Sequence, residues 1–125
     1  MSTTAQYAAT PKVGMGTLSV ANANLDGTGT LVTVFTAGAS GSRIDLVTVK
    51  STGTTTNGVI RLFIHNGTTA YLLTEIESLA VTPASNVKAW EQGVQLNLVI
   101  PTGYSLRASA SKAETFNVIA MGGDF

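Results

Sequence analysis

Short apolar runs separated by turn-forming residues constrain this chain more than any other feature of its sequence. The runs are rich in Val, Ile, Leu and Thr. Gly, Asn, Asp or Pro interrupts them at intervals of roughly eight to twelve residues, the spacing typical of an all-β sandwich or barrel. β-Branched side chains favour a pleated, half-buried surface. The pattern therefore predicts an antiparallel β-sandwich without a helix.

A single domain with eight strands is expected from the 125 residues. Residues 1–12 are predicted to form a polar N-terminal arm, and residues 13–125 a single β-sandwich domain. Asn66 and Gly67 give the strongest hairpin signal in the chain. Eight antiparallel strands in two facing sheets favour a jelly roll. The expected strands cover residues 14–21, 31–36, 43–50, 59–65, 71–77, 88–95, 104–110 and 115–121.

Charge is scarce, since 11% of residues are charged and 44% are hydrophobic, and the formal net charge is +0. No basic stripe is present to neutralise phosphates, so we expect no nucleic-acid partner. No run resembles a secretory signal or reaches the length of a membrane-spanning helix, so we expect no membrane partner either. The chain has no cysteine, which excludes disulfides and thiolate metal sites.

Two expected strands are apolar on both faces, whereas a sheet with one wet face alternates apolar and polar residues. In the third strand, Ile44 and Leu46 are expected on one side and Val47 and Val49 on the other. Residues 59–65 show the same pattern. Part of an outer face must therefore be covered by a loop, by the arm or by a neighbouring subunit, and we favour the subunit.

Catalytic patterns are weak throughout the sequence. His65, the one histidine, is interpreted as a strand-end residue without a nucleophile to activate. Asp26 and the glycines after it indicate a turn rather than a calcium loop, because one carboxylate is too few for calcium. Glu75 and Glu77 share one side of a strand and are interpreted as a solubilising or interface patch. We therefore expect no catalytic residue, metal or cofactor, and no enzyme activity.

Five residues are candidates for contact with a partner, and each carries a large or charged side chain. Arg61 lies between apolar neighbours and is expected to be paired with an acid. Trp90 is interpreted as a core residue, with an interface anchor as the alternative, because large aromatic side chains dominate interfaces. The complete set of interface candidates is Tyr7, Arg61, Phe63, Trp90 and Tyr104.

Over residues 12–125 the chain resembles small virion structural proteins encoded by tailed bacteriophages. The motifs that carry this resemblance are strand-and-turn patterns. They are Asp26-Gly-Thr-Gly-Thr30, Gly41-Ser-Arg-Ile-Asp45, Gly58-Val-Ile-Arg-Leu-Phe-Ile64, Tyr104-Ser-Leu-Arg-Ala-Ser109 and Glu114-Thr-Phe-Asn-Val-Ile-Ala120.

The resemblance implies a non-enzymatic jelly-roll decoration (cement) or auxiliary protein of the phage head, assembled as a homotrimer. Its partners would be copies of itself and the major capsid protein or another virion protein. The protein would be made in the host cytoplasm and reside in the virion. The alternative is a tail or fibre-associated jelly-roll module that binds host surface glycan or another virion protein.

Overall fold

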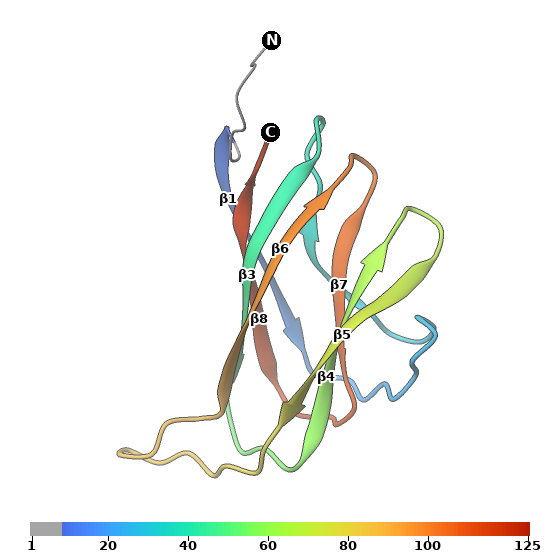
Figure 1. Cartoon of the computed structure of the whole chain (residues 1–125). Coiled ribbons are helices and arrows are strands. Elements are labelled where there is room, and N and C mark those ends of the chain that lie inside the picture. Colours follow the sequence, from blue (N-terminus) through green and yellow to red (C-terminus); the bar gives the residue numbers. More distant parts are fainter. Residues whose placement is uncertain (1–8) are drawn as a thin grey trace.

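Two four-stranded antiparallel sheets pack face to face in the structure, a computed structural model that describes residues 9–125. One sheet has the strand order β1-β8-β3-β6 and the other β2-β7-β4-β5 (Figure 1). The described residues contain no helix, and hence none long and apolar enough to cross a membrane. The expected all-β sandwich is confirmed. Its strands are β1 (Thr10–Leu18), β2 (Val32–Thr36), β3 (Ser42–Ser51), β4 (Gly58–His65), β5 (Ala70–Ser78), β6 (Glu91–Ile100), β7 (Ser105–Ala110) and β8 (Phe116–Asp124).

The order of pairing is that of a jelly roll. β1 pairs with β8, β2 with β7, β3 with β6 and β4 with β5, as if one long hairpin had been rolled up. The innermost pair is the hairpin expected at Asn66 and Gly67. The Asn66 Oδ1 accepts hydrogen bonds from the backbone N–H groups of Thr68 and Thr69, at 3.0 and 2.8 Å. Gly67 has a φ of 96°, which favours glycine at this position.

Several strand boundaries differ from those expected, most of all in β1 and β6. β1 begins at Thr10, which is paired with Asp124 of β8, so residues 10–12 of the expected arm belong to the sheet. β6 begins at Glu91 and continues beyond residue 95 to Ile100. It does so through Asn97, which has a φ of 49° and sits opposite an irregularity in β3. Asn tolerates this left-handed conformation better than most residues.

A β-bulge in β3 corrects the expected facing of its apolar residues. The register with β6 and β8 shifts between Ile44 and Leu46, so the alternation changes phase there. Ile44, Val47 and Val49 are consequently all fully buried in the core, whereas Leu46 turns to the outer face. β3 is therefore not apolar on two opposite faces in the way that strict alternation predicts.

The apolar outer side of β4 is covered by the chain itself. Leu62 belongs to the core between the sheets, and Phe63, next to it, faces the other way; it is 0% exposed yet lies outside the core cluster. Arg107, its partner on β7, lines a hollow together with the loop at residues 26–31. This loop therefore lies over that side of the sheet. Of the three covers considered from the sequence, a loop is the one that the described residues show on this side of the sheet.

The core fills the space between the two sheets with side chains from all eight strands and from the loop before β6. Trp90 is 7% exposed and meets Phe116 edge to face, with ring centroids 5.8 Å apart. Such a pair stabilises a core by about 0.5–1.5 kcal/mol beyond its buried area. The interpretation of Trp90 as a core residue is confirmed.

Candidate functional site

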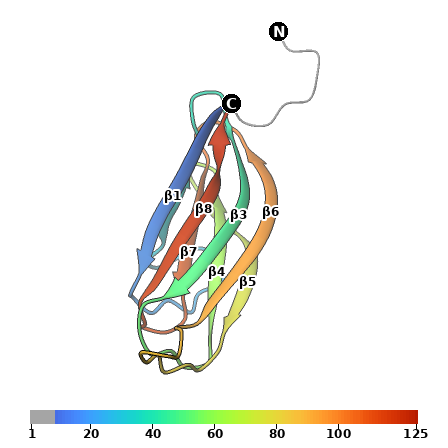
Figure 2. The ribbon, with the colours of Figure 1, turned by 90° about the vertical axis from the view of Figure 1, so that its left-hand side faces the viewer.

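The outer side of the sheet β1-β8-β3-β6 carries an uncharged apolar surface that residues 9–125 leave uncovered. We call this surface the four-strand face; it is the outer side of β1, β8, β3 and β6, and this sheet faces the viewer in Figure 2. The register places its apolar side chains in adjacent rows, one across β1, β8 and β3 and the next across β1 and β8. The first row holds Val13, Met121 and Leu46, and the second holds Met15 and Ile119.

Val13 and Met15 face outward because Gly14 and Gly16, which alternate with them, occupy the inward positions. Val13 is 56% and Met15 is 70% exposed. A side chain on Gly14 would point at β2, where a Cβ atom would lie 2.2 Å from the carbonyl oxygen of Val34. The edges of the two sheets thus approach too closely for a side chain. Sequence reasoning missed this face, although the alternation of apolar residues with glycine in β1 was its signal.

Ion pairs border the four-strand face at both ends. Arg43 and Asp45 lie 2.6 Å apart at one end, and Lys50 lies 3.5 Å from Glu91 at the other. A hydrogen bond from Lys88, reinforced by the charge of Lys50, lowers the pKa of Glu91. Each border contains both signs of charge. The face therefore has an apolar centre and a polar rim, the arrangement that marks interaction sites on protein surfaces.

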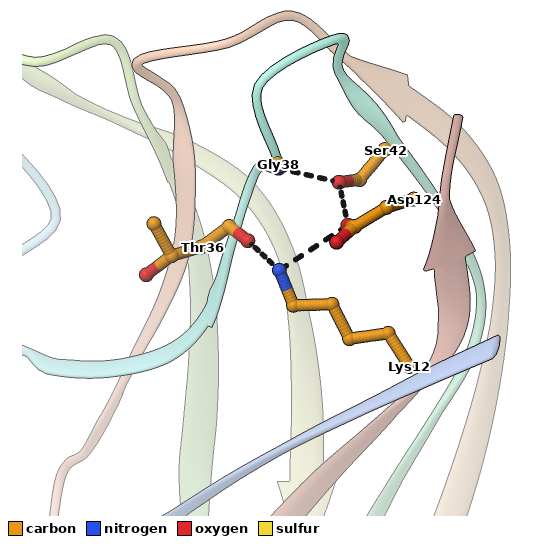
Figure 3. A network of polar contacts seen from close by, with 5 residues as sticks. All are labelled: Lys12, Thr36, Gly38, Ser42 and Asp124. Carbon is orange, nitrogen blue, oxygen red and sulfur yellow. Dashed lines mark hydrogen bonds and ion pairs between the residues drawn. The ribbon is translucent and has the colours of Figure 1, made fainter. Parts of the chain in front are cut away.

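A polar network closes the end of the sandwich where the C-terminus lies beside the start of β1 (Figure 3). Lys12 points inward, with its ammonium 4.8 Å from the centre of the Phe35 ring. It donates to the carbonyl oxygen of Thr36, and to Asp124 at 3.2 Å. The hydroxyl of Ser42 donates to Asp124 at 2.6 Å and accepts from the backbone of the loop after β2. The network ties β1, β2, β3 and β8 together, which is a structural role.

One of the five sequence candidates, Arg61, forms an ion pair with an acidic residue of the same protomer. Arg61 contacts Glu75 at 3.1 Å on the outer side of the sheet β2-β7-β4-β5, so its expected pairing is confirmed. The Arg61 side chain is 11% exposed. Glu77 lies on the same outer side of β5 and is exposed. This charged pair is formed within the protomer.

The aromatic candidates do not gather on one surface. Phe63 and Trp90 are buried within the protomer, so the expectation that they anchor an interface is corrected. Tyr104 is partly buried and packs against the edge of the core. Tyr7 lies outside the described residues. Among the described residues, Phe63, Trp90 and Tyr104 form no ring contact with one another, and the four-strand face uses aliphatic and methionine side chains instead.

A second feature, a polar hollow, lies on the opposite side of the sandwich. Asp26, His65 and Arg107 line it, although the sequence places them far apart. The predicted turn at Asp26 is confirmed, because its Oδ1 accepts from the backbone N–H of Thr28 at 3.1 Å and from the Thr28 hydroxyl at 2.6 Å. These hydrogen bonds lower the pKa of Asp26. His65 ends β4, as expected.

Within residues 9–125, no three His, Asp or Glu side chains are grouped closely enough to hold a metal ion. No family model matches the chain, and no curated protein matches it either. The four-strand face and the hollow are therefore judged on their own chemistry.

Proposed function

We propose that this protein is a non-enzymatic structural component that assembles with copies of itself through the four-strand face. The observation that carries the proposal is an exposed apolar surface whose centre holds no charged side chain and whose borders hold balanced ion pairs. The formal net charge of +0 means that copies do not repel one another over long distances. Either border of one copy can meet a border of another without an excess of like charge.

The particle in which the protein assembles is proposed from the sequence resemblance. We propose a decoration (cement) protein of a tailed-bacteriophage head, a homotrimer that binds the major capsid protein or another virion protein. A closed trimer uses head-to-tail contacts, so the four-strand face would meet a different surface on the next copy. Supporting features are the jelly-roll order of the strands and the apolar face, which are suited to a repeated packing unit.

Self-association is tested by sedimentation velocity at micromolar concentration. The unmodified protein is expected to sediment as a closed oligomer. Met15→Glu combined with Met121→Glu is expected to give a monomer, because a charge in the buried centre of a contact is costly to desolvate. Leu79→Glu is the matched control, since Leu79 is 56% exposed but lies outside the four-strand face. Circular dichroism checks that both variants remain folded.

Two results would contradict the proposal. One is a monomeric unmodified protein at micromolar concentration, and the other is an oligomer that the double substitution leaves intact. Mass analysis of heads separated from tails then locates the protein in the particle. Its presence in heads supports a decoration role, and its presence in tails alone overturns it.

The alternative is a tail or fibre-associated module that binds host surface glycan or another virion protein. The hollow lined by Asp26, His65 and Arg107 is the observation that favours it. Mass analysis of heads separated from tails distinguishes the two functions, because the alternative places the protein in tails or fibres.

A further inference from the structure

The hollow on the outer side of the sheet β2-β7-β4-β5 has a volume of about 300 Å³. This value is at the lower end of the range for small-molecule sites. One wall is the loop that begins at Asp26, and the other is the β4–β5 turn with Thr68 and Thr69. Arg107 of β7 lines it between them. The four-strand face lies on the other sheet, so the hollow is not part of that face.

Hydrogen bonds hold the loop wall in one shape. The side chain of Asn22, which is buried, donates from Nδ2 to the carbonyl oxygens of Thr28 and Thr30, at 3.0 Å each. Gly27 has a φ of 84° and lies so close to Ala70 that a Cβ atom would be 2.7 Å from its carbonyl oxygen. The loop is therefore fixed against β5 before any ligand arrives, which reduces the entropic cost of binding.

Arg107 differs from the other two arginines of the chain. Arg43 and Arg61 each pair with a carboxylate, at 2.6 and 3.1 Å. Within residues 9–125, Arg107 has no such partner, and its Nε donates to the hydroxyl of Ser105 at 3.2 Å. The terminal nitrogens of a guanidinium suit two oxygens of one acid group. A partly buried arginine beside a hollow, without an acid of its own, indicates an anionic group on the ligand.

The β4–β5 turn supplies further hydrogen-bonding groups. The backbone N–H of Gly67 donates to the Nδ1 of His65 at 3.1 Å, so a neutral His65 carries its proton on Nε2. The hydroxyl groups of Thr68 and Thr69 form no hydrogen bond with the described residues, and both residues are exposed. These donors and acceptors match the hydroxyl groups of a ligand.

Asp26 makes the hollow selective. Its Oδ1 is occupied by Thr28, whereas its Oδ2 forms no hydrogen bond with the described residues. An ionised carboxylate accepts hydrogen bonds from ligand hydroxyls, but it repels a simple anion that offers no donor. A ligand with both an acid group and hydroxyl groups satisfies Arg107 and Asp26 together.

We propose that this hollow binds an acidic sugar, with the sugar carboxylate on Arg107 and its hydroxyl groups on Asp26 and the Thr68–Thr69 turn. The site is distinct from the self-association surface and does not depend on it. It would give a particle-bound protein a means of attachment to acidic glycans.

The test is a titration followed by amide chemical shifts, with four probes of stated chemistry. N-acetylneuraminate and methyl glucuronide carry both groups, methyl glucoside lacks the acid, and acetate lacks the hydroxyls. The two acidic sugars are expected to shift the signals of Gly27, Thr68 and Arg107. Methyl glucoside and acetate are each expected to bind about tenfold more weakly or worse, because one charged hydrogen-bonding contact is lost.

Substitutions assign the effect to named residues. Arg107→Gln is expected to weaken binding of the acidic sugars by about tenfold or more, and Arg107→Lys by less, because lysine keeps the charge but not the planar fork. Lys112→Gln removes one positive charge at an exposed position outside the hollow, and it is expected to leave the binding affinity for the acidic sugars unchanged. Asp26→Asn is expected to reduce the difference in binding affinity between the acidic sugars and acetate. Urea unfolding verifies that each variant is folded.

Three outcomes would overturn the proposal. They are no shifts with either acidic sugar, equal binding of acetate, and unchanged binding by Arg107→Gln. Sedimentation of Arg107→Gln separates this proposal from the preceding one, since the variant is expected to keep the oligomeric state of the unmodified protein. Failure of the sugar site therefore leaves the self-association result unaffected.

Discussion

Asp124 links residues from four strands at one end of the sandwich, although it lies next to the last residue of the chain. It accepts hydrogen bonds from Ser42 and Lys12, and its side chain is only partly exposed. The hydroxyl of Ser42, followed by the ammonium of Lys12, lowers the pKa of Asp124 below its ordinary value of 3.8. A carboxylate whose pKa is lowered by folding stabilises the folded state above the ordinary value, and this contribution is lost as the pH falls through the lower value.

Asp124→Asn is therefore expected to lower the urea midpoint at pH 7 and to flatten its dependence on pH between 7 and 3. The amide keeps an acceptor for Ser42 but loses the charge that attracts Lys12. Glu77→Gln is the matched control, because Glu77 is exposed and forms no ion pair with the described residues. If Asp124→Asn and the unmodified protein show the same slope against pH, this account of Asp124 is wrong.

In the edge strand β1, apolar residues and glycines alternate, but the apolar side chains face solvent rather than the core. In most half-buried strands the apolar positions face the core. In β1 the glycines face β2, and Val13 and Met15 face solvent, because the two sheets meet closely at this edge. The alternating sequence predicts a strand here, but it does not say which of the two sides is buried.

Gly14→Ala is expected to destabilise the fold by about 1–3 kcal/mol, the range for overpacking at a close contact. The new Cβ would overlap the backbone of β2, which cannot move away as a flexible side chain could. Gly53→Ala is the control, since a Cβ there would meet no atom within 4 Å, and a change within about 0.5 kcal/mol is expected. Equal urea midpoints for the two variants would contradict the close approach of β1 and β2.

β3 and β4 show which parts of the architecture follow from sequence and which do not. Their apolar runs predicted strands, and the Asn66–Gly67 turn predicted the hairpin that β4 forms with β5. The bulge at Asp45 was not predicted, because an inserted residue looks like any other residue of a strand. The cover over Phe63 was not assigned either, since it depends on where a loop distant in sequence returns to the sheet.

At the scale of the whole molecule, the sandwich presents two different surfaces on its two sheets. The four-strand face is apolar and is not covered by the part of the chain that the structure describes, whereas the other sheet is partly covered by a loop and carries a polar hollow. Sequence composition indicated that apolar surface would be left for a partner, but two of the five interface candidates, Phe63 and Trp90, are buried. Only the register of β1 with β8 and β3 brings Val13, Met121 and Leu46 into one row.

Oxidative footprinting of Met15 and Met121 over a concentration series measures the central claim directly. Both side chains are exposed in the single protomer, and Met15 is the more exposed of the two. Their oxidation is expected to fall together as the protein concentration rises from nanomolar to micromolar, while that of Tyr71, an exposed ring on the other sheet, stays constant. Constant oxidation of both methionines at concentrations where an oligomer is present would show that copies associate through a different surface.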